Sequence, residues 1–291
     1  MPTITLTSLH DTLTTAAGNY IINSGGGNDT ITTGAGNGAI YATLAGNNTI
    51  TMGAGNNIVH TTGMGNQTIT TGAGISDIIT GAGNSTITTG AGGSAVTTGD
   101  GNSTITTGAG VSIIRTGDGN NTITTGAGGS TITTGVGIGN NTITTGAGGS
   151  TVTTSGGNDT ITTGAGNSIV DSGTGNDTVT TAAGNDMVTY KVTGNLGNHS
   201  TFTAGTGIDT LKLVMTCAEL NSADMQSDIA NYMTFLSANK AANGEDGAAA
   251  FTFKAIGLTA SMFENLQVVA DGYSLTQTEL VGVHFYGHCG M

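Results

Sequence analysis

Aspartates recur at fixed spacing in this chain, and the spacing points to cation chemistry. Asp11 and Asp29 are 18 residues apart, as are Asp159 and Asp177, and Asp186 follows nine residues later. If 18 residues make one turn of a regularly wound backbone, the carboxylates of each pair stack about 5 Å apart. Stacked carboxylates repel each other, and a hard cation such as calcium, which prefers several oxygen ligands, relieves that repulsion.

Asp100 and Asp118 are also 18 residues apart, but they occupy another place in the repeating pattern. They are candidates either for a further cation site or for solvated turn acids, since Asp is a common turn residue. The formal net charge of −13, with only five Lys and Arg residues, also favours cations as partners. It argues against nucleic acid, because phosphate neutralisation needs basic side chains.

The elements that position these acids follow from a nine-residue phrase, Gly-x-Gly-Asn-x-Thr-Ile-Thr-Thr in its commonest form. A fixed short period is typical of a solenoid, in which each unit buries its apolar side chain by stacking on its neighbours. The aliphatic residues that mark the 21 phrases are Ile4, Leu13, Ile22, Ile31, Ile40, Ile50, Val59, Ile69, Ile78, Ile87, Val96, Ile105, Ile114, Ile123, Ile132, Ile143, Val152, Ile161, Val170, Val179 and Val188.

Thr-Ile-Thr predicts a short strand, because both residue types are β-branched and side chains alternate along a strand. Gly-x-Gly-Asn predicts a tight turn, and from Gly18 onward a Gly precedes every aliphatic residue by four positions. Such a position needs positive φ or close backbone approach. Two phrases make one 18-residue coil, so the prediction is an all-β solenoid of about ten coils. Three longer steps, ending at Ile50, Ile69 and Ile143, predict extra residues in turns.

The phrase resembles the nonapeptide of the RTX (repeats-in-toxin) family, Gly-Gly-x-Gly-x-Asp-x-aliphatic-x. The best matches are Gly25–Ile31, Gly156–Ile161, Gly175–Val179 and Gly184–Val188. The resemblance implies a right-handed parallel β-roll that holds calcium between successive turns through the motif Asp and turn carbonyls. The calcium ligands so implied are Asp11, Asp29, Asp159, Asp177 and Asp186, with the carbonyls of Gly27, Gly157 and Gly175.

The middle of the repeat departs from that family pattern. From Gly38 to Ser150 the position of the motif Asp holds Gly, Asn, Gln or Ser and never a carboxylate. We therefore expect weak or no calcium binding there. Asn and Ser at stacked positions can form hydrogen-bond ladders from coil to coil instead. The residues that suit such a ladder are Asn84, Asn102, Asn120 and Asn140.

After Val192 the nine-residue pattern is no longer recognisable, so we predict a β-roll over residues 1–192 and a small α+β capping region over 193–291. Strands are expected at 210–215, 251–253 and 266–269. A helix capped by Asn221, with Asp224 in its first turn, should precede the second of these strands. Cys217 and Cys289 either pair in an oxidising compartment or remain two free thiols.

The resemblance to the RTX family implies an extracellular location. The sequence shows no recognisable cleaved N-terminal signal and no apolar run of membrane-spanning length, so export would need another signal. The segments Gly207–Leu211 and Phe263–Leu266 resemble the ends of proteins that leave the cell through a type I exporter, which reads an uncleaved C-terminal signal.

Flat, uncharged Thr-x-Thr rows are expected on both broad faces of the roll. They favour packing against copies of the same chain, since charged residues are the usual guard against such association. The leading function is a non-enzymatic structural protein that assembles into a filament, matrix fibre or surface layer. The alternative is an ice-binding or adhesive module, with ice or a cell-surface polysaccharide as partner. A third reading, the RTX tail of an enzyme, lacks a recognisable catalytic motif.

Overall fold

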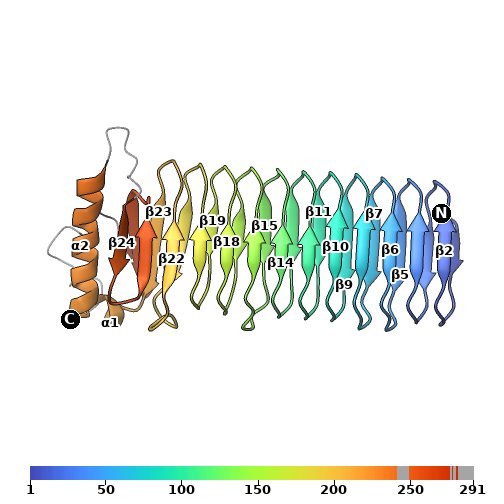
Figure 1. Ribbon diagram of the computed structural model, residues 1–291, viewed down its shortest axis with the longest axis horizontal. Helices are drawn as coiled ribbons and strands as arrows, with labels where there is room; N and C mark the ends of the chain where they lie inside the picture. Colours follow the sequence, from blue (N-terminus) through green and yellow to red (C-terminus); the bar gives the residue numbers. More distant parts are fainter. Residues whose placement is uncertain (241–248, 276, 278–279, 281–291) are drawn as a thin grey trace. The chain divides into compact units, whose positions relative to one another are not determined.

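The computed structural model describes residues 1–240, 249–275, 277 and 280 (Figure 1). The chain forms two compact units, Met1–Ala147 and Gly148–Met291, called here the N-terminal and C-terminal units. Among the described residues, no helix is long and apolar enough to cross a membrane. Cys217 is disulfide-bonded, whereas Cys289 lies outside the described residues.

In the N-terminal unit, successive strands alternate between two parallel sheets, and each sheet pairs every second strand (Figure 1). Sheet A consists of β1 (Thr3–Thr5), β3 (Ile21–Ser24), β5 (Gly38–Ala42), β7 (Asn57–Thr61), β9 (Ser76–Thr80), β11 (Ser94–Thr97), β13 (Ser112–Arg115) and β15 (Ser130–Thr133). Sheet B consists of β2 (Thr12–Thr15), β4 (Thr30–Thr33), β6 (Thr49–Met52), β8 (Thr68–Thr71), β10 (Thr86–Thr89), β12 (Thr104–Thr106), β14 (Thr122–Thr124) and β16 (Thr142–Thr144).

The core is a stack of the repeating aliphatic residues. On β12, Ile105 is fully buried while Thr104 and Thr106 on either side of it are exposed. Ile105 pairs in register with Ile87 on one neighbouring strand and Ile123 on the other. Full burial of such a side chain contributes about 2–3 kcal/mol, so each coil depends on its neighbours for most of its stability. The prediction of a parallel β-solenoid with 18-residue coils is confirmed.

The three irregular steps of the repeat lie in turns, as predicted. The strands keep their register across the longest step, since Ile123 still pairs with Ile143 although they are 20 residues apart. The extra residues lie in the turn between β15 and β16, where Val136 and Ile138 are 92% and 90% exposed. The turn absorbs the insertion because it lies outside the strands and can lengthen without shifting their register.

Glycine is required where the backbone of one coil meets the next. Gly101 has φ 134°, and a Cβ on this residue would lie 2.5 Å from the carbonyl oxygen of Gly83 in the preceding coil. Both the positive φ and the close approach predicted for this position are therefore present.

The C-terminal unit is wound in the same way. Both of its ladders run parallel up to β25 and β26 and end in an antiparallel strand, β24 or β27. Its elements are β17 (Thr151–Thr153), β18 (Thr160–Thr162), β19 (Ile169–Asp171), β20 (Thr178–Thr180), β21 (Met187–Lys191), β22 (Ser200–Thr203), β23 (Thr210–Met215), α1 (Cys217–Leu220), α2 (Ala223–Asn239), β24 (Ala250–Phe253), β25 (Leu258–Ser261), β26 (Asn265–Ala270) and β27 (Tyr273–Leu275).

Parallel pairing does not stop at Val192. Phe202 of β22 pairs with Val179, and Leu211 of β23 pairs with Val188, so both occupy the place of the repeating aliphatic residue. Both side chains are fully buried. The predicted division into residues 1–192 and 193–291 stays a prediction. The parallel pairing of β20 with β22 and of β21 with β23 crosses that boundary.

The C-terminal helix forms where the sequence predicts it, but its cap differs. Ser222 is the N-cap of α2 and its hydroxyl accepts a hydrogen bond from the N–H of Met225. Asn221, the predicted cap, is instead the C-cap of the short helix α1. The two helices follow each other so closely that one residue ends α1 and the next begins α2.

Candidate calcium sites in the turns

The residue two positions before each aliphatic residue, called here the inner position, turns its side chain into the coil. Because side chains alternate along an extended backbone, it lies on the same side as the aliphatic residue. Asp29, Asp159 and Asp177 are 1% exposed and Asp186 is 2% exposed, while Asp11 is half-buried. Most of the predicted calcium ligands are thus carboxylates removed from water.

The N-terminal pair, Asp11 and Asp29, is already well supplied with hydrogen bonds. The backbone N–H of Asp11 donates to Oδ1 of Asp29 at 2.9 Å, and the hydroxyl of Ser24 donates to Oδ2. Oδ2 of Asp11 accepts from the N–H and the hydroxyl of Thr7 at 2.8 and 2.7 Å. The predicted stacking of these two acids is therefore present, and protein donors reach both carboxylates.

Asp159 and Asp177 stack in the same way in the C-terminal unit, but Asp177 is less well compensated. Its Oδ1 accepts from the backbone N–H of Asp159 at 3.0 Å. Its buried Oδ2 accepts no hydrogen bond of normal geometry from the described residues, although the hydroxyl of Ser172 lies close enough to act on this carboxyl. Burial raises the pKa of Asp177 from 3.8 to about 6, against the lowering effects of the Asp159 N–H and the Ser172 hydroxyl, and the charges of Asp159 and Asp171 add to the rise. A bound cation would supply the missing compensation.

Asp186 belongs to the opposite edge of the coil, where sequence analysis found no partner for it. Its Oδ1 accepts from the N–H of Ser168 at 2.7 Å, and its own N–H donates to Oδ1 of Asp209 at 2.7 Å. Its Oδ2 is buried and accepts no hydrogen bond of normal geometry from the described residues. Burial raises the pKa of its carboxyl, against the lowering effects of the Ser168 N–H and the Thr181 hydroxyl. Asp186 and Asp209 therefore form a second stacked pair.

Asp209 is the site residue that sequence reasoning missed. It is fully buried, and its N–H donates to Oε2 of Glu264 at 2.5 Å. The signal was available, because Gly207 and Asp209 stand four and two positions before Leu211, the places of the turn Gly and the motif Asp in matching phrases such as Gly175–Val179. The two segments that resemble an export signal, Gly207–Leu211 and Phe263–Leu266, thus meet through Asp209 and Glu264.

The carboxylates of Asp100 and Asp118, the further candidate pair, accept hydrogen bonds from backbone N–H groups. Oδ1 of Asp100 accepts from the N–H of Asp118 at 2.9 Å, and Oδ1 of Asp118 accepts from Gly137 at 2.7 Å. Both residues are exposed. This arrangement matches solvated turn acids, and a cation site at this pair stays a prediction.

Neutral side-chain ladders occur in the turns of the middle coils, where the inner position holds no acid. At the outer position, three residues before the aliphatic residue, Oδ1 of Asn102 accepts at 2.7 Å from the N–H of Asn120 in the following coil. At the inner position, Oδ1 of Asn121 accepts at 3.0 Å from Ser103 in the preceding coil. At the outer position the N–H of Asn102 also donates to Oδ1 of Asn84, and the N–H of Asn140 donates to Oδ1 of Asn120, both at 2.7 Å.

The buried acids fit a calcium ion better as pairs assisted by carbonyls than as carboxylate clusters. Within the described ranges, no three His, Cys, Asp or Glu residues group as a metal site. Asp159 with Asp177 and Asp186 with Asp209 would supply charge, and turn carbonyls would supply the remaining oxygens. Of the three predicted carbonyls, that of Gly175 accepts from the hydroxyl of Ser200 at 3.1 Å. Those of Gly27 and Gly157 face the α-carbons of Gly46 and Gly175.

The two sheets of the N-terminal unit present different outer faces. Every strand of sheet B turns two exposed threonines outward, such as Thr86 and Thr88 on β10. Sheet A is mixed, so the expectation of Thr rows on both faces is wrong. Its outward residues between β3 and β13 are Ile21, Asn23, Ala39, Tyr41, Ile58, His60, Asp77, Ile79, Ala95, Thr97, Ile113 and Arg115.

Stacked parallel coils with glycine turns and buried inner aspartates define a β-roll of the calcium-binding type. The family model of the RTX calcium-binding nonapeptide repeat matches residues 7–40, 42–63, 97–132, 136–170 and 153–188. The chain is therefore an RTX β-roll protein, and its repeats indicate calcium binding. No curated protein and no solved structure matches it significantly.

Proposed function

We propose that this chain is a secreted, non-enzymatic structural protein that assembles with copies of itself outside the cell, with calcium held at the buried acid pairs of the C-terminal unit. The observation that carries the proposal is the outer face of sheet B. Its eight strands each contribute two exposed threonines in register and no charged residue. A flat face without charge costs little to desolvate and lacks the usual protection against face-to-face packing.

The RTX repeat supports the extracellular part of this proposal, since proteins with such repeats are typically secreted. Export through a type I system, and a filament or surface layer as the product, belong to the same proposal.

The test places lysines on the threonine face. The triple variant Thr86→Lys, Thr104→Lys and Thr122→Lys should lose assembly in calcium, because three stacked positive charges oppose packing of that face. The matched control, Ala95→Lys, Thr97→Lys and Thr131→Lys, adds the same charge to exposed positions of sheet A and should keep assembly. Light scattering after size exclusion and negative-stain microscopy report the outcome. A wild-type chain that stays monomeric in calcium at all accessible concentrations would contradict the proposal.

A second candidate function rests on the same face. Regular rows of hydroxyl and methyl groups also suit adsorption to an ordered water or polysaccharide surface. Monomers that slow ice recrystallisation, and lose this effect only in the sheet B lysine variant, would favour that function over self-assembly.

A further inference from the structure

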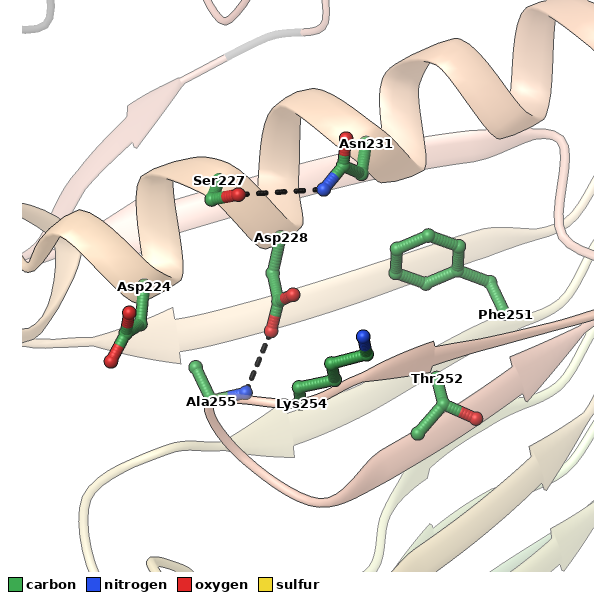
Figure 2. A pocket seen from close by; sticks show the side chains of 8 residues that line it. All are labelled: Asp224, Ser227, Asp228, Asn231, Phe251, Thr252, Lys254 and Ala255. Carbon is green, nitrogen blue, oxygen red and sulfur yellow. Dashed lines mark hydrogen bonds between the residues drawn. The ribbon is translucent and has the colours of Figure 1, made fainter.

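A polar cavity of about 520 Å³ lies between helix α2 and the strand β24 with the turn that follows it (Figure 2). Four residues of α2 line one wall at helical spacing, Asp224, Ser227, Asp228 and Asn231, so they share one face of the helix. Phe251, Thr252, Lys254 and Ala255 line the other wall. The volume lies within the range of small-molecule sites.

The two walls are fixed to each other without a ligand. Asp228 is only 7% exposed, and its Oδ2 accepts a hydrogen bond of 2.7 Å from the N–H of Ala255 (Figure 2). The ring of Phe251 packs 5.1 Å from that of Tyr232 and 4.9 Å from that of Phe253. Packing and one buried hydrogen bond therefore fix the two walls of this solvent-open pocket relative to each other.

Lys254 brings a positive charge to this cavity that pairs with no acid of the described residues. It extends from the strand side towards α2 (Figure 2). The chain has only five Lys and Arg residues against 18 Asp and Glu. The ammonium of Lys254 thus keeps three hydrogen-bond donors for a ligand, while Asp224 across the cavity offers acceptors.

This combination selects for one ligand class. Opposite charges on the two walls give a ligand of single net charge one attracting and one repelling group, so they favour a neutral molecule that can hydrogen-bond to both walls. Hydroxyls, an amide and charged groups beside an aromatic ring suit a molecule that both donates and accepts along one edge and is apolar on its face. We propose that the cavity binds a neutral sugar residue of a glycan.

Saturation-transfer NMR on the full calcium-loaded chain tests this with methyl glucoside, methyl galactoside and N-acetylglucosamine as probes. At least one sugar should receive saturation. Asp224→Asn and Lys254→Met should each weaken its binding about tenfold, because each removes a charged hydrogen-bond partner. Lys212→Met, on β23 and outside the cavity lining, is the control and should leave binding unchanged.

Three results would overturn the proposal while circular dichroism shows the chain folded. The first is no saturation transfer to any of the three sugars, and the second is sugar binding that both cavity variants leave intact. The third is that no sugar binds while the zwitterion β-alanine does, with the same dependence on Asp224 and Lys254. The test uses neither the threonine face nor self-assembly, so it stands or falls separately from the proposed function.

Discussion

At the scale of single residues, the inner position sets the chemistry of each turn. Asp177, Asn121 and Ser103 all occupy it, and Asp177 and Asn121 accept the same kind of backbone hydrogen bond from the coil before. They differ in charge. A buried Asn needs no counter-ion, whereas burial raises the pKa of Asp177 to about 6 because its ionised form is poorly compensated.

Asp177→Asn should therefore stabilise the calcium-free protein at neutral pH. The folded-state pKa of about 6 lies above the ordinary 3.8. Below pH 3.8 the Asp177 carboxyl is protonated in both the folded and the unfolded chain. As the pH rises from 3.8 through 6, the unfolded chain loses this proton more readily than the folded one, so the folded chain loses stability. In chelator, the free energy of unfolding of the wild type should fall by about 1–2 kcal/mol between pH 4 and pH 7, whereas that of the variant should not show this fall. Thermal unfolding across this range measures the difference.

The control is Asp100→Asn, which removes an exposed carboxylate and should leave that pH dependence in place. Identical pH profiles for Asp177→Asn and the wild type would show that burial of this carboxyl does not cost stability.

At the scale of elements, the turns that lead into β12, β14 and β16 are held on both sides by side-chain ladders that run in opposite directions. Inner side chains accept from the preceding coil, and outer asparagines such as Asn102 accept from the following one. Each such bond contributes about 1 kcal/mol net. A turn of this kind should therefore be stable without metal as long as the inner side chain is neutral.

Restoring acids to the inner position should make a metal-independent turn depend on calcium. The double variant Asn121→Asp and Asn141→Asp keeps the acceptor geometry but buries two adjacent charges, since both residues are at most 3% exposed. We expect a loss of about 2–4 kcal/mol in chelator at pH 7, with recovery on adding calcium. Thermal unfolding with and without calcium measures both effects.

The matched control moves each substitution one residue outward, to Asn120→Asp and Asn140→Asp. These residues are exposed, so the added charge stays hydrated and should cost less than about 1 kcal/mol. Equal losses for the two double variants would mean that burial at the inner position does not distinguish them.

At the scale of the whole molecule, charge is unevenly distributed along the repeat. The inner positions between β8 and β16 are neutral, whereas Asp159, Asp177, Asp186 and Asp209 are buried in the C-terminal unit. Coils in a solenoid contact only their neighbours, so local stability can differ along the chain.

Calcium removal should therefore loosen the chain locally. Hydrogen exchange followed by mass spectrometry should show faster exchange of residues 159–215 in chelator, while residues 68–144 keep their protection. The double variant Asp177→Asn and Asp186→Asn should show a smaller response to calcium over residues 159–215. Equal loss of protection in both regions would contradict a metal-independent middle.

The coil itself could be predicted from sequence, because every contact that builds it repeats at the same spacing. Ile105 must be buried and Thr104 exposed once the period and the strand alternation are recognised. The outer ladder of Asn84, Asn102 and Asn120 follows from the same spacing. These features are local or lie one coil away, so the nine-residue phrase contains all the information they need.

Only the tertiary structure decided how unlike segments meet. It linked Asp209 to Glu264, gave the threonine rows to one face, and formed the open pocket between α2 and Lys254. These contacts join segments outside the regular repeat, or depend on which edge of a coil a residue occupies. No spacing rule determines such contacts, because they arise from packing between elements whose separation along the chain is irregular.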